Sequence, residues 1–337
     1  MKNVLYITTD VSFLNRTDAG GGVVENSHLK LMKLNGYNIR ILFLNTLLFS
    51  QKIKPNLVGS RNVPLFNNGM VKIDEIQLSM TETPKGIVSR IKNFSTDLTN
   101  YYYPFINNEN TNFLKSYLKD LKIDFIWAQW FYSGLVCSRL KLKYPIFYVH
   151  HDWQYKLIKY KKKRSFKTLV LTEAKKKIER KFISKLTATI CLSYSDYKIL
   201  KDKNFKTFYL PITYDSDLIK NKNKERIFPN LVHLGNLNTT ANKVGLEYFF
   251  QFVWEEIKIQ YPNIKLEIIG KEIRSNNEFM HKIKNDKNII YYNYIENLEE
   301  VLYPYDIHII PWNKDTGTRT RIPLIFKFKQ CVVAMQQ

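Results

Sequence analysis

The chain has 337 residues, of which 45% are hydrophobic and 24% are charged, and its formal net charge is +22. This length is enough for two α/β domains, and the balance of apolar and charged residues excludes an intrinsically disordered chain. The excess of Lys and Arg indicates an anionic partner: nucleic acid, an acidic membrane surface or a phosphorylated ligand.

The first elements along the chain form a strand–helix–strand unit. The apolar run Val4–Ile7 is typical of a buried strand, and Gly20–Gly22 are expected in the loop that follows it. A helix is predicted over Val23–Asn35 and ends at Gly36, since a helix end commonly needs a residue that tolerates positive φ. With the next strand at Ile39–Leu44, this order predicts a parallel sheet.

The alternation continues to about residue 213. Three more strands and one long basic helix are predicted, at Asp124–Trp127, Pro145–Val149, Ala188–Leu192 and, for the helix, Ser165–Lys185. The segment Phe208–Asp217, which contains Pro211, is expected to leave this domain, and Lys220–Arg226 is expected to be a solvated linker. We therefore place one domain at residues 1–213 and a second at 214–337.

A second α/β series follows the linker. Its strands are predicted at Asn230–Leu234, Lys265–Ile269, Ile289–Tyr292, Ile307–Ile310 and Val332–Ala334. A loop is expected at Gly235–Asn242 and one continuous helix at Gly245–Gln260. Because the sequence stops at Gln337, directly after a strand, where a doubly wound domain normally continues, we expect this domain to be truncated.

The cysteines and the N-terminus bear on the cellular compartment. Cys137, Cys191 and Cys331 show no paired spacing, so neither a disulfide framework nor a zinc site is expected. The apolar run after Met1 is too short for a signal peptide, and Phe125–Cys137 falls short of a membrane span. These features predict a cytoplasmic protein, which can still be peripheral to the inner face of a membrane.

One candidate catalytic group follows a predicted strand. His150, His151 and Asp152 stand at the carboxyl end of Pro145–Val149, the edge where open parallel sheets bind ligands. A histidine there can orient a substrate hydroxyl or share developing charge, with Asp152 holding it. The alternative is a pair of loop histidines with Asp152 capping the next helix.

Two other segments have the composition of an anion site. Gly20–Gly22 precede a helix, so their N–H groups can approach an anion, although a flexible connection explains them equally well. Asp315–Arg321 combines glycine, hydroxyls and the two arginines Arg319 and Arg321 before a predicted helix. Because the planar guanidinium binds phosphate bidentately, we interpret this segment as a phosphate cradle rather than a solvated turn.

The region Lys156–Lys185 is strongly basic, with thirteen Lys or Arg against Glu173 and Glu179. Its apolar side chains are expected to lie along one face that packs on the domain: Phe166, Leu169, Val170, Ile178, Phe182 and Ile183. A solvated helix face and an anionic membrane surface both fit such a segment. Nucleic acid is not expected as a partner, because no zinc-finger spacing, aromatic RNA-binding motif or recognition helix is present.

Several motifs resemble, in order and spacing, the retaining GT-B glycosyltransferases of glycosyltransferase family 4. In the first half these are Val4–Ile7 with Gly20–Gly22, Gly36–Ile39, Asp124–Ile126, Tyr148–Asp152, Ile190–Ser193 and Leu210–Ile212. In the second half they are Val232–Phe249, Leu266–Gly270 and Gly317–Ile322, the last being similar to the family motif Gly-Thr-Gly-Thr-Arg-x-Lys-Ile.

The resemblance implies two Rossmann-like doubly wound domains that face a cleft, with the acceptor on the first and a nucleoside-diphosphate sugar on the second. It implies transfer of the sugar with retention, without a cofactor or bound metal. His151 would contact the donor sugar, with Asp152 beside it. The remaining donor-site positions implied are Gly21 and Gly22 near the phosphates, Gly235, Asn236 and Asn242 at the start of the second domain, Tyr294 and Ile295 at the base, and Gly317, Thr318, Arg319 and Arg321 at the diphosphate.

The sequence also departs from the family pattern. The paired glutamates of the family fall on Thr316 and Leu324, and leucine cannot accept the hydroxyls of the nucleotide ribose. Asn236 and the region of Asn242 replace its usual basic residues. The sequence is therefore compatible with two functions: an active glycosyltransferase that acts on a glycan or lipid-linked glycan, and a degenerate, non-catalytic relative that serves as a binding or partner subunit.

Overall fold

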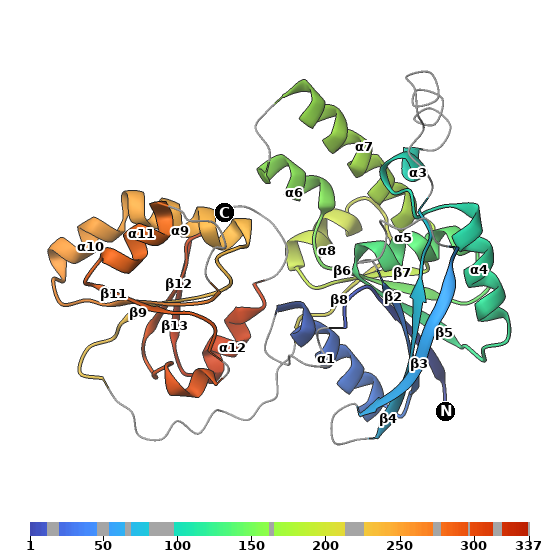
Figure 1. Cartoon of the computed structure of the whole chain (residues 1–337), viewed down its shortest axis with the longest axis horizontal. Coiled ribbons are helices and arrows are strands. Elements are labelled where there is room, and N and C mark those ends of the chain that lie inside the picture. The colour runs from blue at the N-terminus through green and yellow to red at the C-terminus, as the bar shows by residue number, and fades with distance from the viewer. Residues whose placement is uncertain are drawn as a thin grey trace. The chain divides into compact units, whose positions relative to one another are not determined.

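The computed structural model describes residues 1–11, 20–45, 54–64, 69–80, 98–161, 165–212, 226–271, 278–295, 297–312 and 319–335. The chain forms two compact units, one within residues 1–213 and the other within residues 214–337, and each is a layered α/β structure (Figure 1). The predicted linker Lys220–Arg226 lies outside the described residues except for Arg226.

Unit 1 is built on an eight-stranded sheet with the order β3-β4-β2-β1-β5-β6-β7-β8. All neighbouring strands are parallel except the antiparallel pair β3 and β4. The predicted parallel sheet is confirmed. The strands are β1 (Asn3–Thr8), β2 (Asn38–Asn45), β3 (Asn56–Pro64), β4 (Met70–Gln77), β5 (Phe125–Gln129), β6 (Ile146–His150), β7 (Ala188–Cys191) and β8 (Thr207–Tyr209).

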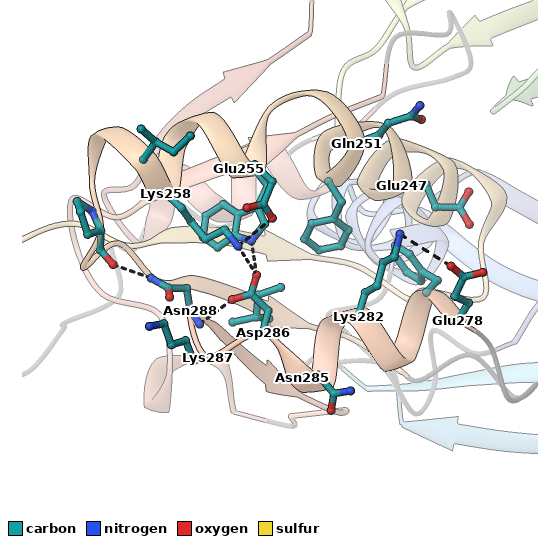
Figure 2. Close-up of a pocket in the computed structure, with 16 residues that line it drawn as sticks. Glu247, Gln251, Glu255, Lys258, Glu278, Lys282, Asn285, Asp286, Lys287 and Asn288 are labelled. Atoms are coloured by element: carbon teal, nitrogen blue, oxygen red, sulfur yellow. Dashed lines mark hydrogen bonds and ion pairs between the residues drawn. The ribbon is translucent and has the colours of Figure 1, made fainter.

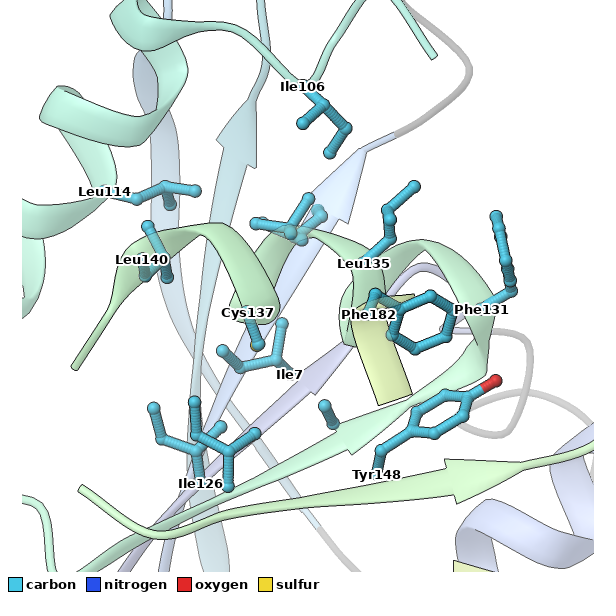
Figure 3. Close-up of a cluster of buried hydrophobic side chains, with 14 of the residues drawn as sticks. Ile7, Ile106, Leu114, Ile126, Phe131, Leu135, Cys137, Leu140, Tyr148 and Phe182 are labelled. Carbon is cyan, nitrogen blue, oxygen red and sulfur yellow. The ribbon is translucent and has the colours of Figure 1, made fainter. Parts of the chain in front are cut away.

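Helices cover both faces of this sheet (Figure 1). Apolar side chains alternate along the strands, so β1 sends Val4 and Tyr6 to the face that carries α1, and Leu5 and Ile7 to the other. On that second face, Phe131, Leu135 and Cys137 of α5 pack with Phe182 of α7 (Figure 3). The helices are α1 (Gly20–Leu34), α3 (Leu98–Tyr102), α4 (Asn108–Lys119), α5 (Trp130–Leu140), α6 (Gln154–Lys161), α7 (Phe166–Ile183) and α8 (Tyr194–Lys201).

Two predictions about unit 1 were wrong. Gly20–Gly22 do not lie in the loop but form the first turn of α1, where the N–H groups lack intrahelical partners anyway. The apolar side chains of α7 do not form one buried face: Ile178 and Phe182 are buried, whereas Phe166 is 83% exposed. The first turns of α7 extend beyond the part of the helix that packs on the sheet, which leaves Leu169 and Val170 exposed as well.

Unit 2 has a five-stranded parallel sheet with the order β11-β10-β9-β12-β13. Helices α9, α10 and α11 pack on one face through Phe249, Trp254 and Phe279, and α12 packs on the other through Phe328 directly after it (Figure 1). The elements are β9 (Leu231–Leu234), α9 (Thr240–Phe252), α10 (Trp254–Gln260), β10 (Leu266–Ile269), α11 (Glu278–Asn285), β11 (Ile289–Tyr292), the 3₁₀ turn η2 (Leu298–Glu300), β12 (Ile307–Ile310), α12 (Arg321–Lys327) and β13 (Cys331–Ala334).

The five strands predicted for unit 2 are confirmed, but the helix after β9 differs in two ways. It begins at Thr240, so Asn242 lies in its first turn rather than in a loop. It is also broken at Val253, whose φ of −130° is outside the helical range. The break lets the buried Trp254 donate its indole N–H to Asp286 Oδ2 over 2.8 Å.

Candidate functional site

Two glycines shape the carboxyl edge of the unit 2 sheet. Gly235 follows β9 and Gly270 follows β10, and their backbones lie so close that a Cβ on Gly270 would overlap the carbonyl oxygen of Gly235. A Cβ on Gly235 would overlap the side chains of Asn242 and Arg321. The absence of a side chain at Gly270 therefore lets the two backbones approach, and its absence at Gly235 lets Asn242 and Arg321 reach the strand end.

Asn242 and Arg321 are joined in one hydrogen-bond network at this edge. The Arg321 guanidinium donates to the carbonyl of Leu234, and its Nη2 donates to Asn242 Oδ1 over 2.6 Å. Asn242 Nδ2 in turn donates to the backbone carbonyl of Asn236 over 3.0 Å. The guanidinium has five N–H donors, so donors remain for a ligand after these bonds are made.

Positive charge is concentrated at this network. Burial, and secondly the like charge of Arg319, lower the pKa of Arg321 to about 10. Burial also lowers the pKa values of His233 and His308 well below their usual range, so both imidazoles are neutral beside Arg321. The like charges of Arg319 and Arg321 repel each other, and a bound anion would relieve this repulsion.

Of the other predicted donor-site residues of unit 2, two lie at the same edge of the sheet and two lie outside the described residues. Tyr294 and Ile295 follow β11, two strands from β9 at the same edge of the sheet. The Tyr294 ring is 47% exposed, with Lys271 Nζ 5.5 Å from its centroid, whereas Ile295 packs partly into the apolar cluster below. Leu324 packs against that cluster too. Gly317 and Thr318, together with Thr316, lie outside the described residues.

In unit 1, the carboxyl edge of the sheet holds His151 against aromatic and amide groups. The Trp130 indole stacks on the His151 ring with centroids 3.7 Å apart and planes 14° from parallel. Gln129 Nε2 lies 2.8 Å from His151 Nε2, and because an amide nitrogen only donates, the imidazole accepts there and carries its proton on Nδ1. Burial, followed by the nearby His28 and His150, lowers the pKa of His151, so the ring is neutral. Asp152, half-buried, comes directly after it.

Glu25 is a buried carboxyl at the same edge that the sequence reasoning missed. Its Oε1 accepts from the Thr8 hydroxyl over 2.5 Å and from the Trp130 indole N–H over 3.2 Å, and its Oε2 has no hydrogen-bond partner among the described residues. Burial, reinforced by the charge of Asp10, raises the pKa of Glu25 well above its usual range. One sequence feature could have indicated Glu25: it is an acidic residue on α1 at a position that faces inward, as Val24 and Leu29 do.

Trp130 has a strained backbone, with a φ of +70° that a bulky residue rarely adopts. This conformation ends β5 abruptly and turns the indole toward both His151 and Glu25. Gly21 and Gly22, in the first turn of α1, precede Glu25 by about one turn. Trp130 therefore contacts the predicted residue His151 on one side and, on the other, Glu25, which follows Gly21 and Gly22 on α1.

A large hollow elsewhere in unit 2 does not coincide with these residues. It has a volume of about 1070 Å³ and lies between α9, α10 and α11, with Asn288 and Ile289 at the start of β11 in its wall (Figure 2). It is therefore at the amino end of the sheet, opposite to Gly235 and Tyr294. Several of its charged side chains pair with one another: Lys258 Nζ lies 2.8 Å from Glu255 Oε1 and 2.9 Å from Asp286 Oδ2.

The described part of the chain contains neither a candidate metal site nor a candidate membrane span. No group of three or more His, Cys, Asp or Glu side chains there is arranged to hold a metal ion. Within the same residues, no helix is long and apolar enough to cross a membrane.

Each of the two units is a doubly wound α/β domain, as in the GT-B fold, and solved structures of that fold match over almost the whole chain. A sucrose-phosphate synthase from Thermosynechococcus elongatus aligns with 99% of this chain and 81% of its own, at a TM-score of 0.64 and 13% identity. The E. coli trehalose-6-phosphate structure bound with UDP-2-fluoro glucose aligns with 99% of this chain and 84% of its own, at a TM-score of 0.62 and 12% identity. A trehalose-phosphate synthase (UDP-forming) from Burkholderia xenovorans, in complex with glucose-6-phosphate, aligns with 99% of this chain and 85% of its own, at a TM-score of 0.60 and 11% identity.

These similarities establish the fold. No protein-family model matches the sequence, and no curated protein matches it significantly.

Proposed function

We propose that the chain is a glycosyltransferase that moves a sugar from a nucleoside-diphosphate donor to a glycan or lipid-linked glycan acceptor, with retention of configuration. The observation that carries this proposal is the Arg321 guanidinium, held by Asn242 and Leu234 at the carboxyl edge of the unit 2 sheet with Arg319 close by. A structure of the same fold that contains UDP-2-fluoro glucose supports a nucleotide-sugar donor. The assignment to glycosyltransferase family 4 is part of the proposal.

The proposed chemistry is electrostatic. As the bond between the sugar and the diphosphate breaks, negative charge develops on the departing phosphate. We assign neutralisation of this charge to Arg319 and Arg321 of unit 2, without a metal ion or cofactor. Neutral His151 would hold a hydroxyl of the transferred sugar, and Asp152 would hold His151 in place.

A donor-turnover assay tests the proposal. The full chain is incubated with radiolabelled UDP-, GDP- and dTDP-sugars, alone and with bacterial glycolipid extracts, and both transfer and donor hydrolysis are measured. We expect turnover with one donor and its loss in the Arg321→Met variant. Turnover that Arg321→Met leaves intact would contradict the proposed role of this edge.

The alternative is a non-catalytic relative that binds a partner, and Leu324 favours it because its side chain packs into the core rather than offering a carboxylate to a ribose. Absence of both nucleotide-sugar binding and turnover, in a folded sample, would favour this alternative, and tight binding of a nucleotide sugar would contradict it.

We also propose that α7 brings the protein to an anionic membrane surface from the cytoplasmic side. Phe166, Leu169 and Val170, at spacings of three and four residues, share one side of the helix and are 83%, 61% and 41% exposed. Lys167, also exposed, lies among them in a segment rich in Lys and Arg. Apolar side chains flanked by cations are the composition of interfacial helices.

Sedimentation with lipid vesicles tests this second proposal. We expect binding to vesicles that contain phosphatidylglycerol, weaker binding to phosphatidylcholine alone, and loss of binding in Phe166→Ser with Leu169→Ser. Phe252→Ser is a matched control, because Phe252 is 52% exposed on α9 of unit 2. Equal binding by both variants would refute the role of α7.

A further inference from the structure

Three tyrosines gather at one end of the unit 1 sheet. Ser193 caps α8 by accepting from the N–H of Asp196, so Tyr194 begins the helix and Tyr197 lies one turn further on the same side. Their rings are nearly parallel, 27° apart with centroids 5.9 Å apart. Tyr209, the last residue of β8, completes the group at 5.5 Å from Tyr194 and 6.2 Å from Tyr197.

The rings of this tyrosine cluster are open to solvent on one side. Tyr194 is 54% exposed and Tyr209 is 44% exposed, whereas Tyr197 is half-buried and packs against the main core of unit 1. Tyr197 therefore anchors the cluster, and the other two present aromatic surface. Contiguous exposed aromatic surface of this kind is typical of a binding site.

Two lysines lie over the same rings. Lys198 Nζ is 4.8 Å from the centroid of Tyr194, and Lys201 Nζ is 5.4 Å from the centroid of Tyr197. Each lysine follows its tyrosine by four residues, so the helix itself sets the pairing. Both lysines are exposed, and the cluster therefore offers ammonium groups beside aromatic faces.

The cluster is at the catalytic edge of the sheet in the proposed function. Tyr194 follows β7 and Tyr209 ends β8, while His151 follows β6, and these three parallel strands are neighbours in the sheet. The carboxyl ends of all three lie at one edge. A chain-like ligand bound on the tyrosines could thus extend along this edge toward His151.

We propose that Tyr194, Tyr197 and Tyr209, with Lys198 and Lys201, form a subsite for a negatively charged glycan, the acceptor chain in the proposed function on which this inference rests. Sugar C–H groups carry weak positive charge and are attracted to the negative faces of aromatic rings. Carboxylate or phosphate groups on the same glycan pair with the lysines. Single-stranded RNA combines bases and phosphates in a similar way, but a glycan is favoured because the cluster shares its edge with the proposed sugar-transfer residues.

Calorimetric titration of the full chain tests the subsite. The probes are galacturonate and hyaluronate oligosaccharides, a neutral malto-oligosaccharide of equal length, and an oligouridylate of equal length. We expect the two acidic glycans to bind more tightly than the other probes. Tyr194→Ala and Tyr209→Ala should each weaken acidic-glycan binding by about tenfold or more. Tyr248→Ala, a control at a ring that is 40% exposed on α9, should leave it unchanged.

Absence of acidic-glycan binding, equal loss in Tyr248→Ala, or tighter binding of the oligouridylate would overturn the inference. A parallel titration with UDP separates it from the proposed function. If Tyr194→Ala loses the glycan but keeps UDP, the subsite is supported independently of the donor site. If the wild-type chain binds the acidic glycans through these tyrosines but no nucleotide, the subsite is supported as a glycan site and the donor proposal fails.

Discussion

Replacement of Arg321 by methionine separates binding from folding at the proposed donor site. The side chain is half-buried and donates to Leu234 and to Asn242. Methionine is shorter than arginine, flexible and uncharged, so it keeps the packing of the aliphatic part of the side chain and removes both hydrogen bonds. Two bonds from a charged donor contribute about 1.5–3 kcal/mol each, and their loss destabilises the folded chain.

Removal of the charge acts in the opposite direction. The pKa of Arg321 falls from 12.5 to about 10 in the folded protein, which corresponds to about 3 kcal/mol against the charged form. A neutral side chain does not incur that penalty. Because the two effects largely offset each other, we expect the free energy of unfolding to change by no more than about 2–3 kcal/mol.

Affinity for a nucleoside diphosphate should fall much more clearly. The loss of one charge-assisted contact corresponds to a decrease in affinity of about tenfold to a hundredfold. Titration calorimetry with UDP measures this, and chemical denaturation of the same samples measures stability. Lys282→Ala is the control, since Lys282 is an exposed cation on α11 away from the strand ends. Unchanged UDP affinity in folded Arg321→Met would refute the assignment.

Three further predictions concern buried groups and close contacts. Burial raises the pKa of Glu179 to about 8, so its protonated form favours folding below pH 4.5 and this contribution is lost as the pH rises through 8. Glu179→Gln should therefore reduce the fall in unfolding free energy between pH 5 and 9 by up to about 4 kcal/mol. Glu173→Gln, at an exposed position on the same helix, should leave that fall unchanged. Equal slopes for the two variants would contradict the burial effect. Gly235→Ala should destabilise unit 2 by about 1–3 kcal/mol in denaturant titrations, while Gly59→Ala, where a Cβ meets nothing within 4 Å, should be nearly neutral. His151 should show no change in its NMR ring-proton shifts between pH 5.5 and 8, because its lowered pKa keeps it neutral, and a midpoint near 6.5 would show that the ring is not held as described.

The sequence predicted the strands that form continuous apolar runs between glycine or polar turns, a pattern typical of strands that are covered on both faces. It did not reveal β4, where charged residues separate the buried Val71, Ile73 and Ile76. It also did not reveal β3, whose residues are almost all exposed at the edge of the sheet, or β8, which has three residues. The break at Val253 carries no Gly or Pro signal. At the break, the indole of Trp254 donates to Asp286, which directly follows α11, and such a tertiary contact cannot be predicted from the local sequence.

The predicted site residues fared differently according to their position. His151 was predicted as a site residue because the residues after a strand end mark the ligand edge of a parallel sheet, and this role stays a prediction. Glu25 and Trp130 were missed, since neither belongs to a recognisable motif and both act through contacts between distant segments. Arg321 was predicted as a phosphate ligand, and its buried bonds to Asn242 and Leu234 could not be read from spacing.

The central claim is that the carboxyl edge of unit 2 binds a nucleoside diphosphate. The most direct measurement is a thermal-shift panel of the intact chain with UDP, GDP, dTDP and their sugar conjugates. One nucleotide, at a hundred times its dissociation constant, should add about 2.7 kcal/mol of stability. A selective upward shift that Arg321→Met abolishes would meet the prediction. No shift with any nucleotide, in a sample that unfolds cooperatively, would contradict it.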